Sequence, residues 1–159
     1  MRPATSADPG SVSGCSRVAG VGGSLQPKAA TLVERKTGLA MLGQLGDRRS
    51  REMSRRLRLL ARRAPRHFKT LTADNGTEFH DYKRVERTTG VTFYFATPYH
   101  AWERGSNENF NGLLRQYLPK RTSFAGLTQR DCDAIAHRLN TRPRKRLGYR
   151  TPEECFYVN

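Results

Sequence analysis

Two carboxylates stand where they could bind a metal ion. Asp74 follows a strand-like run, residues 67–72, and Glu108 lies in a run with helical periodicity. On such a helix Asn111 and Arg115, three and seven residues further on, share the face of Glu108. Carboxylate oxygens suit Mg²⁺ or Mn²⁺, and a two-metal site uses them to cut and join phosphodiesters. By residue type alone, however, most Asp and Glu pairs are surface charges.

The element that must carry Glu108 is the best helix in the sequence, predicted over residues 106–118. Ser106 is a good N-cap, and Pro119 ends the helix. An apolar stripe follows the helical repeat, which turns the face of Glu108 away from the core. The stripe consists of Phe110, Leu113, Leu114, Tyr117 and Leu118.

The element before Asp74 is a predicted strand that runs into the turn signal Asp74-Asn75-Gly76. A short helix over residues 79–88 should stop near Gly90. Val91, Phe93 and Phe95 then alternate with Thr92 and Tyr94, which predicts a strand.

The remaining pattern predicts a β-hairpin, two helices and a tail. Residues 31–33 and 39–42 flank a turn, and helices are expected over residues 47–63 and 128–139. The basic, Pro-broken run 142–146 is expected to be extended. Strands with helices between them indicate an α/β sheet covered by helices.

The helix over 47–63 has two opposed stripes. Met53, Leu57, Leu60 and Ala64 form the apolar one, and Arg51, Arg55, Arg58 and Arg62 repeat with the same spacing on the other side. The basic stripe is either a solvated outer face or a contact with a DNA backbone.

Composition narrows the class of protein. The 159-residue chain allows one domain, and its net charge of +15 indicates a polyanionic partner, usually nucleic acid. Its three cysteines show no C-x-x-C spacing, so a zinc site or disulfide framework is not expected. No apolar leader or membrane-length run occurs, so we expect a cytoplasmic protein, nucleoid-associated when bound to DNA.

Several long motifs resemble the insertion-sequence transposases of the IS-thirty family. They are residues 31–37 (TLVERKT), 72–79 (TADNGTEF), 98–120 (PYHAWERGSNENFNGLLRQYLPK) and 142–145 (RPRK). They occur in the family's order, and the resemblance covers residues 29–159. The 33 residues between Asp74 and Glu108 match the family's D-x33-E spacing.

The resemblance implies a ribonuclease-H-like fold, similar to retroviral integrases, with a mixed sheet flanked by helices. It implies that Asp74 and Glu108 are the second and third members of a catalytic metal-binding triad, with two Mg²⁺ or Mn²⁺ ions. It also implies DNA contacts by a set of cations, Arg115 foremost: Arg115, Lys120, Arg104, Arg142, Arg144 and Lys145. Trp102 matches a family position and either packs under the active-site loop, which we favour, or contacts DNA.

The chain departs from the family before the hairpin. The family's first aspartate belongs to a preceding strand, but there is no Asp or Glu between Pro9 and Val33. Residues 1–28 are rich in Gly, Ser, Ala and Pro without a sustained period, and the glycines of 19–23 lack the Lys and Ser or Thr of a phosphate loop. We therefore expect a flexible or non-native segment 1–28, a partial catalytic domain 29–159, and a sheet whose first strand is missing.

These observations favour DNA transposition by metal-dependent strand nicking and transfer, impaired because the first catalytic Asp is absent. Transposon ends and target DNA would be the partners, with a second copy or a full-length transposase as a further one. The alternative is a non-catalytic, basic DNA-binding remnant. A basic protein that binds structured RNA fits the charge but not the motifs.

Overall fold

The computed structural model describes residues 15–23, 26–46, 50–63, 68–73, 76–95, 105–119 and 126–158, with the backbone alone for 15–23, 26–28 and 105–109. Five strands and five α-helices lie in these ranges. The strands are β1 (Cys15–Gly23), β2 (Gln26–Glu34), β3 (Ala40–Gln44), β4 (Thr70–Ala73) and β5 (Thr92–Phe95). The helices are α1 (Ser50–Arg63), α2 (Tyr82–Thr89), α3 (Gly105–Leu114), α4 (Gln129–Asn140) and α5 (Pro152–Tyr157).

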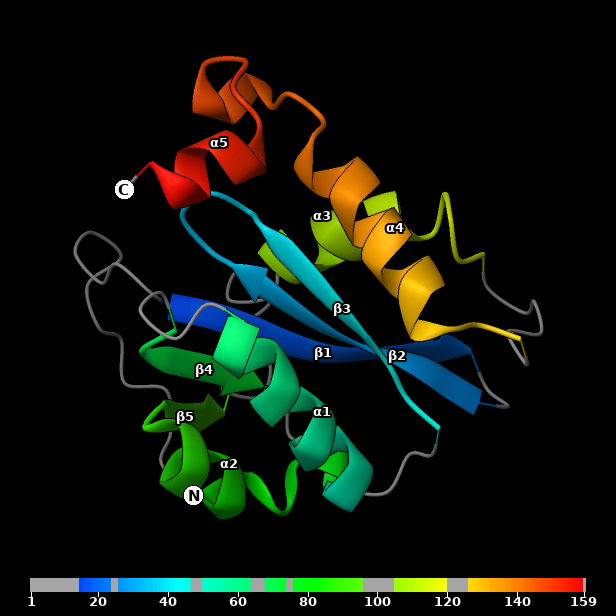
Figure 1. The fold of residues 1–159 in the computed structure, drawn as a ribbon, viewed down its shortest axis with the longest axis vertical. Helices are drawn as coiled ribbons and strands as arrows, with labels where there is room; N and C mark the ends of the chain where they lie inside the picture. The colour runs from blue at the N-terminus through cyan, green and yellow to red at the C-terminus, as the bar shows by residue number, and fades with distance from the viewer. Residues whose placement is uncertain are drawn as a thin grey trace.

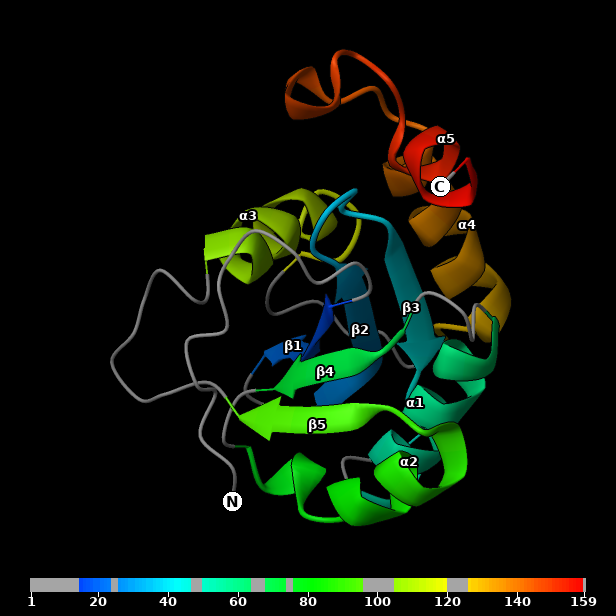
Figure 2. The same cartoon turned by 90° about the vertical axis from the view of Figure 1, so that its left-hand side faces the viewer.

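The strands form one mixed sheet in the order β3-β2-β1-β4-β5 (Figure 2). β1 is antiparallel to β2 and parallel to β4, and β4 is parallel to β5. β1 is therefore the middle strand of the sheet. From the sequence, the first strand of the sheet was expected to be missing, and this was wrong. Residues 15–23, which were assigned to a flexible or non-native segment 1–28, form β1.

Helices cover both faces of the sheet (Figure 1). One buried cluster joins α1, α2 and α5 to Ala30 and Leu32 of β2 and to the inward residues of β4 and β5. A second cluster joins α3 and α4 to Val33 of β2 and Leu42 of β3. Alternate residues of one strand thus enter opposite cores, which is the period of two expected of a strand between two helical layers.

Most predicted elements are confirmed, with shifts at their ends. The hairpin is β2–β3, and Val91, Phe93 and Phe95 are buried on one side of β5 as predicted. α2 begins three residues later than predicted, after a 3-10 turn over Thr77–Phe79, and Gly90 ends it at a φ of 70°. That left-handed conformation favours glycine, which explains the stop.

The sequence interpretation erred at α3 and in the tail. α3 begins at Gly105, so Ser106 lies inside it, and it ends at Leu114 rather than at Leu118. The predicted stripe misled because Leu118, although beyond the helix, is still buried in the same cluster. The tail is not extended: Lys145–Leu147 forms a 3-10 turn, and α5 was not predicted.

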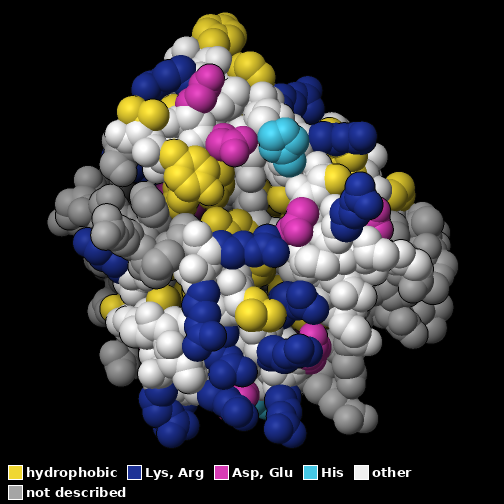
Figure 3. Space-filling view, in the orientation of Figure 1, with side chains coloured by type: hydrophobic (Ala, Val, Ile, Leu, Met, Phe, Trp, Pro, Cys, Tyr) yellow, Lys and Arg dark blue, Asp and Glu magenta, His cyan; other side chains and the backbone are white. Residues whose placement is uncertain are grey.

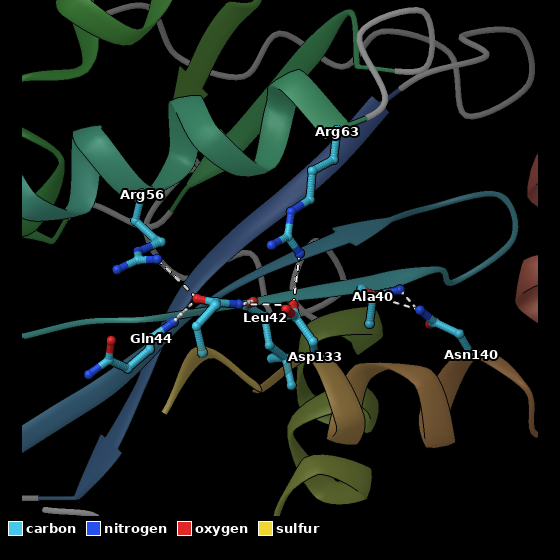
Figure 4. Close-up of polar contacts among 8 residues, drawn as sticks. Ala40, Leu42, Gln44, Arg56, Arg63, Asp133 and Asn140 are labelled. Carbon is cyan, nitrogen blue, oxygen red and sulfur yellow. Dashed lines mark hydrogen bonds and ion pairs between the residues drawn. The ribbon is translucent and has the colours of Figure 1, made fainter. Parts of the chain in front are cut away.

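The outer edge of β3 is covered by two amide side chains of α4 (Figure 4). Asn140 accepts from Ala40 N at 2.8 Å and donates to Ala40 O at 2.8 Å. Gln129 donates to Leu42 O at 2.9 Å and accepts from Gln44 N at 3.0 Å. These bonds satisfy backbone groups that an edge strand would otherwise expose to a pairing partner.

Two of the described cysteines, Cys132 and Cys155, are buried in the cores. Burial raises the pKa of Cys132 to about 11, with the Asp133 carboxylate adding to the effect. A thiol held neutral in this way packs as a small apolar residue. Within the described ranges no helix is long and apolar enough to cross a membrane.

Candidate functional site

Glu108 lies in α3, whose backbone contacts β1 and α4. Phe110 and Leu114 bury the other side of the helix against the second core cluster. Asn111, one turn after Glu108, is half-buried, and its Oδ1 is buried without a hydrogen-bond partner in the part of the chain that the structure describes. An unpaired buried acceptor is costly, which makes Asn111 a notable polar residue on this face of α3.

Asp74 itself lies outside the described residues, as do Asn75 and Trp102. The position of its segment is set by β4, whose last residue, Ala73, pairs with Val18 of β1 and with Phe95 of β5. The chain turns after Gly76, where Phe79 N donates to Gly76 O at 3.1 Å. Asp74 therefore follows directly on a strand held between two parallel neighbours.

The described residues do not complete the carboxylate set that two metal ions need. β1 has the sequence CSRVAGVGG and contains no Asp or Glu. In the described part of the chain no group of three His, Cys, Asp or Glu side chains could hold a metal ion. Asp74 and Glu108 have the right ligand chemistry for a hard cation, but β1, which lies beside β4, supplies no further carboxylate.

Glu34 cannot take the place of the missing carboxylate. It is buried at the end of β2, opposite Ser16 of β1. Its oxygens accept from Lys36 N at 2.7 Å, and from Thr37 N and Thr37 Oγ1 at 2.6 Å each. This acid is committed to the hairpin turn between β2 and β3.

The cations predicted to contact DNA are divided by the structure. Arg115 is exposed directly after α3, and its N–H still donates to Asn111 O at 3.0 Å, so it continues the helical turn. Arg142 and Lys145 are exposed after α4, which packs against α3 on the same face of the sheet. Arg104 and Lys120 lie outside the described residues.

Arg144 differs from its neighbours because it has a structural contact. It is half-buried, and its Nη2 donates to Leu139 O at 3.1 Å, near the carboxyl end of α4. Burial is the main reason that its pKa is lowered, followed by the nearby charges of Arg142 and Arg146. Its guanidinium stabilises a helix end as well as carrying charge.

Two features of the structure were missed at the sequence level. The amides of Gln129 and Asn140 were not singled out, because no sequence pattern pairs them with a strand. α5, by contrast, has a recognisable signal in Thr151-Pro152-Glu153-Glu154. Thr151 and Glu154 form a capping box with Pro at the first turn.

Comparison with known proteins finds similarity to transposases of insertion sequences. The chain is 40% identical over 126 residues to the transposase for insertion sequence element IS4351 of Bacteroides fragilis, a match covering 79% of this chain and 39% of the relative. It is 40% identical over 137 residues to transposase InsI for element IS30A of Escherichia coli, covering 86% of this chain and 36% of the relative. The chain thus spans less than two fifths of the length of these relatives. No protein-family model matches it.

A solved structure supports the fold. The crystal structure of the catalytic core domain of BIV integrase superposes with a TM-score of 0.72 and 20% sequence identity, over 92% of this chain and 95% of that one. The fold is therefore the ribonuclease-H-like fold of a retroviral integrase core, as expected.

Proposed function

We propose that this chain belongs to the IS-thirty (IS30) family of insertion-sequence transposases, to which its 40% identical relatives belong, and that it serves DNA transposition as part of the catalytic domain. The observation that carries the proposal is the placement of the two candidate carboxylates: Asp74 directly follows the parallel strand β4, and Glu108 lies in α3, which contacts β1. β1 is the common neighbour of the two elements, because it pairs with β4 and contacts α3.

DNA is the proposed partner. The net charge of +15 favours a polyanion, and Arg115, Arg142 and Lys145 are exposed on or after the helices that cover one face of the sheet. Arg115, seven residues and about two helical turns after Glu108, is proposed to hold a phosphate next to the carboxylates. Arg104 and Lys120 are proposed as further contacts because they flank the same helix in the sequence.

Asp74 and Glu108 are the proposed ligands of a divalent cation, Mg²⁺ or Mn²⁺. When bound, such an ion would supply Lewis-acid stabilisation of a phosphodiester oxygen. The two carboxylates are too few to clamp two ions, so we propose that strand nicking and transfer are weakened rather than lost.

The test is nicking of a labelled DNA duplex by the full chain in Mn²⁺ or Mg²⁺. We expect weak nicking that requires the cation and vanishes in Glu108→Gln, because the amide keeps the size of the side chain but not its charge. Cation-independent nicking, or nicking equal in the variant, would contradict the assignment of Glu108.

The absence of a carboxylate from β1 favours a second candidate function, that of a DNA-binding protein without catalysis. On this alternative, DNA is retained at low salt, no nicking is seen with either cation, and Glu108→Gln changes neither result. Failure to bind DNA at any salt concentration would exclude both functions.

A further inference from the structure

A large basic surface lies on the face of the sheet opposite α3. It is formed by α1 and α2, which pack against each other over the first core cluster, whereas α3 and α4 belong to the second. The two helices contain nine Lys and Arg and two Glu. Seven of the nine are exposed, and the six of these other than Arg63 define the α1–α2 basic surface: Arg51, Arg55, Arg62, Lys83, Arg84 and Arg87. Figure 3 shows Lys and Arg side chains gathered over this half of the molecule.

The acids of these helices do little to neutralise the surface. Glu86 Oε1 accepts from Phe93 N at 2.7 Å, so this carboxylate is turned toward β5. Glu52 lies 3.5 Å from Arg55 and 3.6 Å from Arg56, and so is shared between two guanidinium groups. Most of the positive charge therefore remains available to a partner.

Two further arginines of α1 contact side chains of α4, so their charges are not counted in the α1–α2 basic surface. Arg56 donates to Gln129 Oε1 at 3.0 Å, and Arg63 pairs with Asp133 at 2.8 Å, so both connect α1 to α4 across the edge of β3 (Figure 4). The remaining stripe faces outward, because Met53, Leu57 and Leu60 fill the inner side of the helix.

The shape of the surface suits an elongated polyanion. Arg51, Arg55 and Arg62 lie on one side of α1 and extend about 16 Å along its axis. A DNA duplex carries one phosphate charge per about 1.7 Å of its axis, so several phosphates could lie along this stripe. A small anion would engage only one or two of these side chains.

The same surface is poorly suited to single-stranded nucleic acid. Proteins that bind single strands stack bases on exposed aromatic rings. Tyr82, the one aromatic residue of α1 and α2, packs its ring on Phe93 and Phe95 at centroid distances of 5.7 and 5.1 Å. Cations without stacking rings favour the backbone of a duplex.

We propose that the α1–α2 basic surface binds the phosphate backbone of double-stranded DNA, as a second DNA contact on the face of the sheet opposite Glu108. The inference rests on the proposed function in one respect, that DNA is the partner. It adds that one chain engages two separate segments of duplex, one on each face of its sheet.

The experiment measures the affinity of the full chain for a 30-base-pair duplex of arbitrary sequence, by fluorescence anisotropy over a range of salt concentrations. The test variant is Arg62→Gln with Arg84→Gln, one substitution on each helix. The control is Arg130→Gln with Arg138→Gln, which removes two exposed charges of α4. The control and the test variant therefore have the same net charge. Thermal unfolding of both variants confirms that the fold is retained.

The test variant should bind about ten-fold or more weakly, and the slope of log Kd against log salt should fall by about 2, since each phosphate contact contributes about 0.9. The control should lose much less. Equal losses in the two variants would overturn the inference but leave DNA as the partner of the proposed function. A wild-type chain that does not bind duplex at all would overturn both. Tighter binding of a single strand, lost in the test variant, would overturn the duplex assignment.

Discussion

Ala19 lies in β1, the strand that pairs with β4 up to the residue before Asp74. Val18 pairs with Ala73, the strands are parallel, and the next residues along them are Ala19 and Asp74. Neighbouring strands are about 4.8 Å apart. We therefore infer that a carboxylate at position 19 would join Asp74 as a cation ligand, which the methyl group of alanine cannot do.

We predict that Ala19→Asp increases cation-dependent nicking by about 100-fold or more, because a single missing catalytic group costs several powers of ten in rate. Labelled duplex and Mn²⁺ provide the assay. Ala19→Asn is the matched control, since it adds a side chain of the same shape without charge. Equal rates for the Asp and Asn variants would show that position 19 is not part of the site. Adding Glu108→Gln to Ala19→Asp should abolish the gain.

Among the elements, α4 stabilises the sheet by occupying the outer edge of β3. Its two amides, Gln129 and Asn140, are 11 residues apart, about three helical turns, and so lie on one side of the helix. They reach the backbone of Ala40, Leu42 and Gln44, alternate residues of the strand. Side chains of a helix thus make the hydrogen bonds that a further strand would make at this edge.

Asn140→Ala should lower the free energy of unfolding by about 1–3 kcal/mol, because both backbone groups of Ala40 lose their partner in a half-buried place. Urea denaturation measures the change. The control is Arg63→Ala, which breaks an ion pair between side chains about half exposed and should cost under about 1 kcal/mol. If the two variants were equally destabilised, the edge contacts of Asn140 would have no special importance.

At the scale of the whole molecule, the elements predicted well are those whose side chains repeat with a clear period. Val91, Phe93 and Phe95 predicted β5, and Met53, Leu57 and Leu60 predicted α1, since burial on one side follows from such repeats. β1 has no such period. Its strand conformation depends on pairing with β2 and β4. This pairing forms only when the sheet assembles, so local propensity does not reveal it.

The candidate site was predictable to the same degree. The helix that carries Glu108 and the strand that precedes Asp74 were evident from the sequence, whereas the roles of the two carboxylates stay predictions. The partner position, Ala19, was not, because register between strands is a property of the assembled sheet. Two predicted cations proved different in kind: Arg115 is exposed, whereas Arg144 binds a helix end.

The middle position of β1 leads to a prediction for the whole fold. Deleting residues 1–23 should abolish cooperative unfolding, because β1 alone connects the β2–β3 hairpin to the β4–β5 pair in the sheet. Far-UV circular dichroism during heating measures the transition. Val18→Pro should weaken the fold in the same direction, since proline removes a hydrogen bond from a strand paired on both sides. A deleted chain that unfolds in one sharp transition within a few degrees of the full chain would show that the hairpin and the β4–β5 pair form a stable sheet without β1.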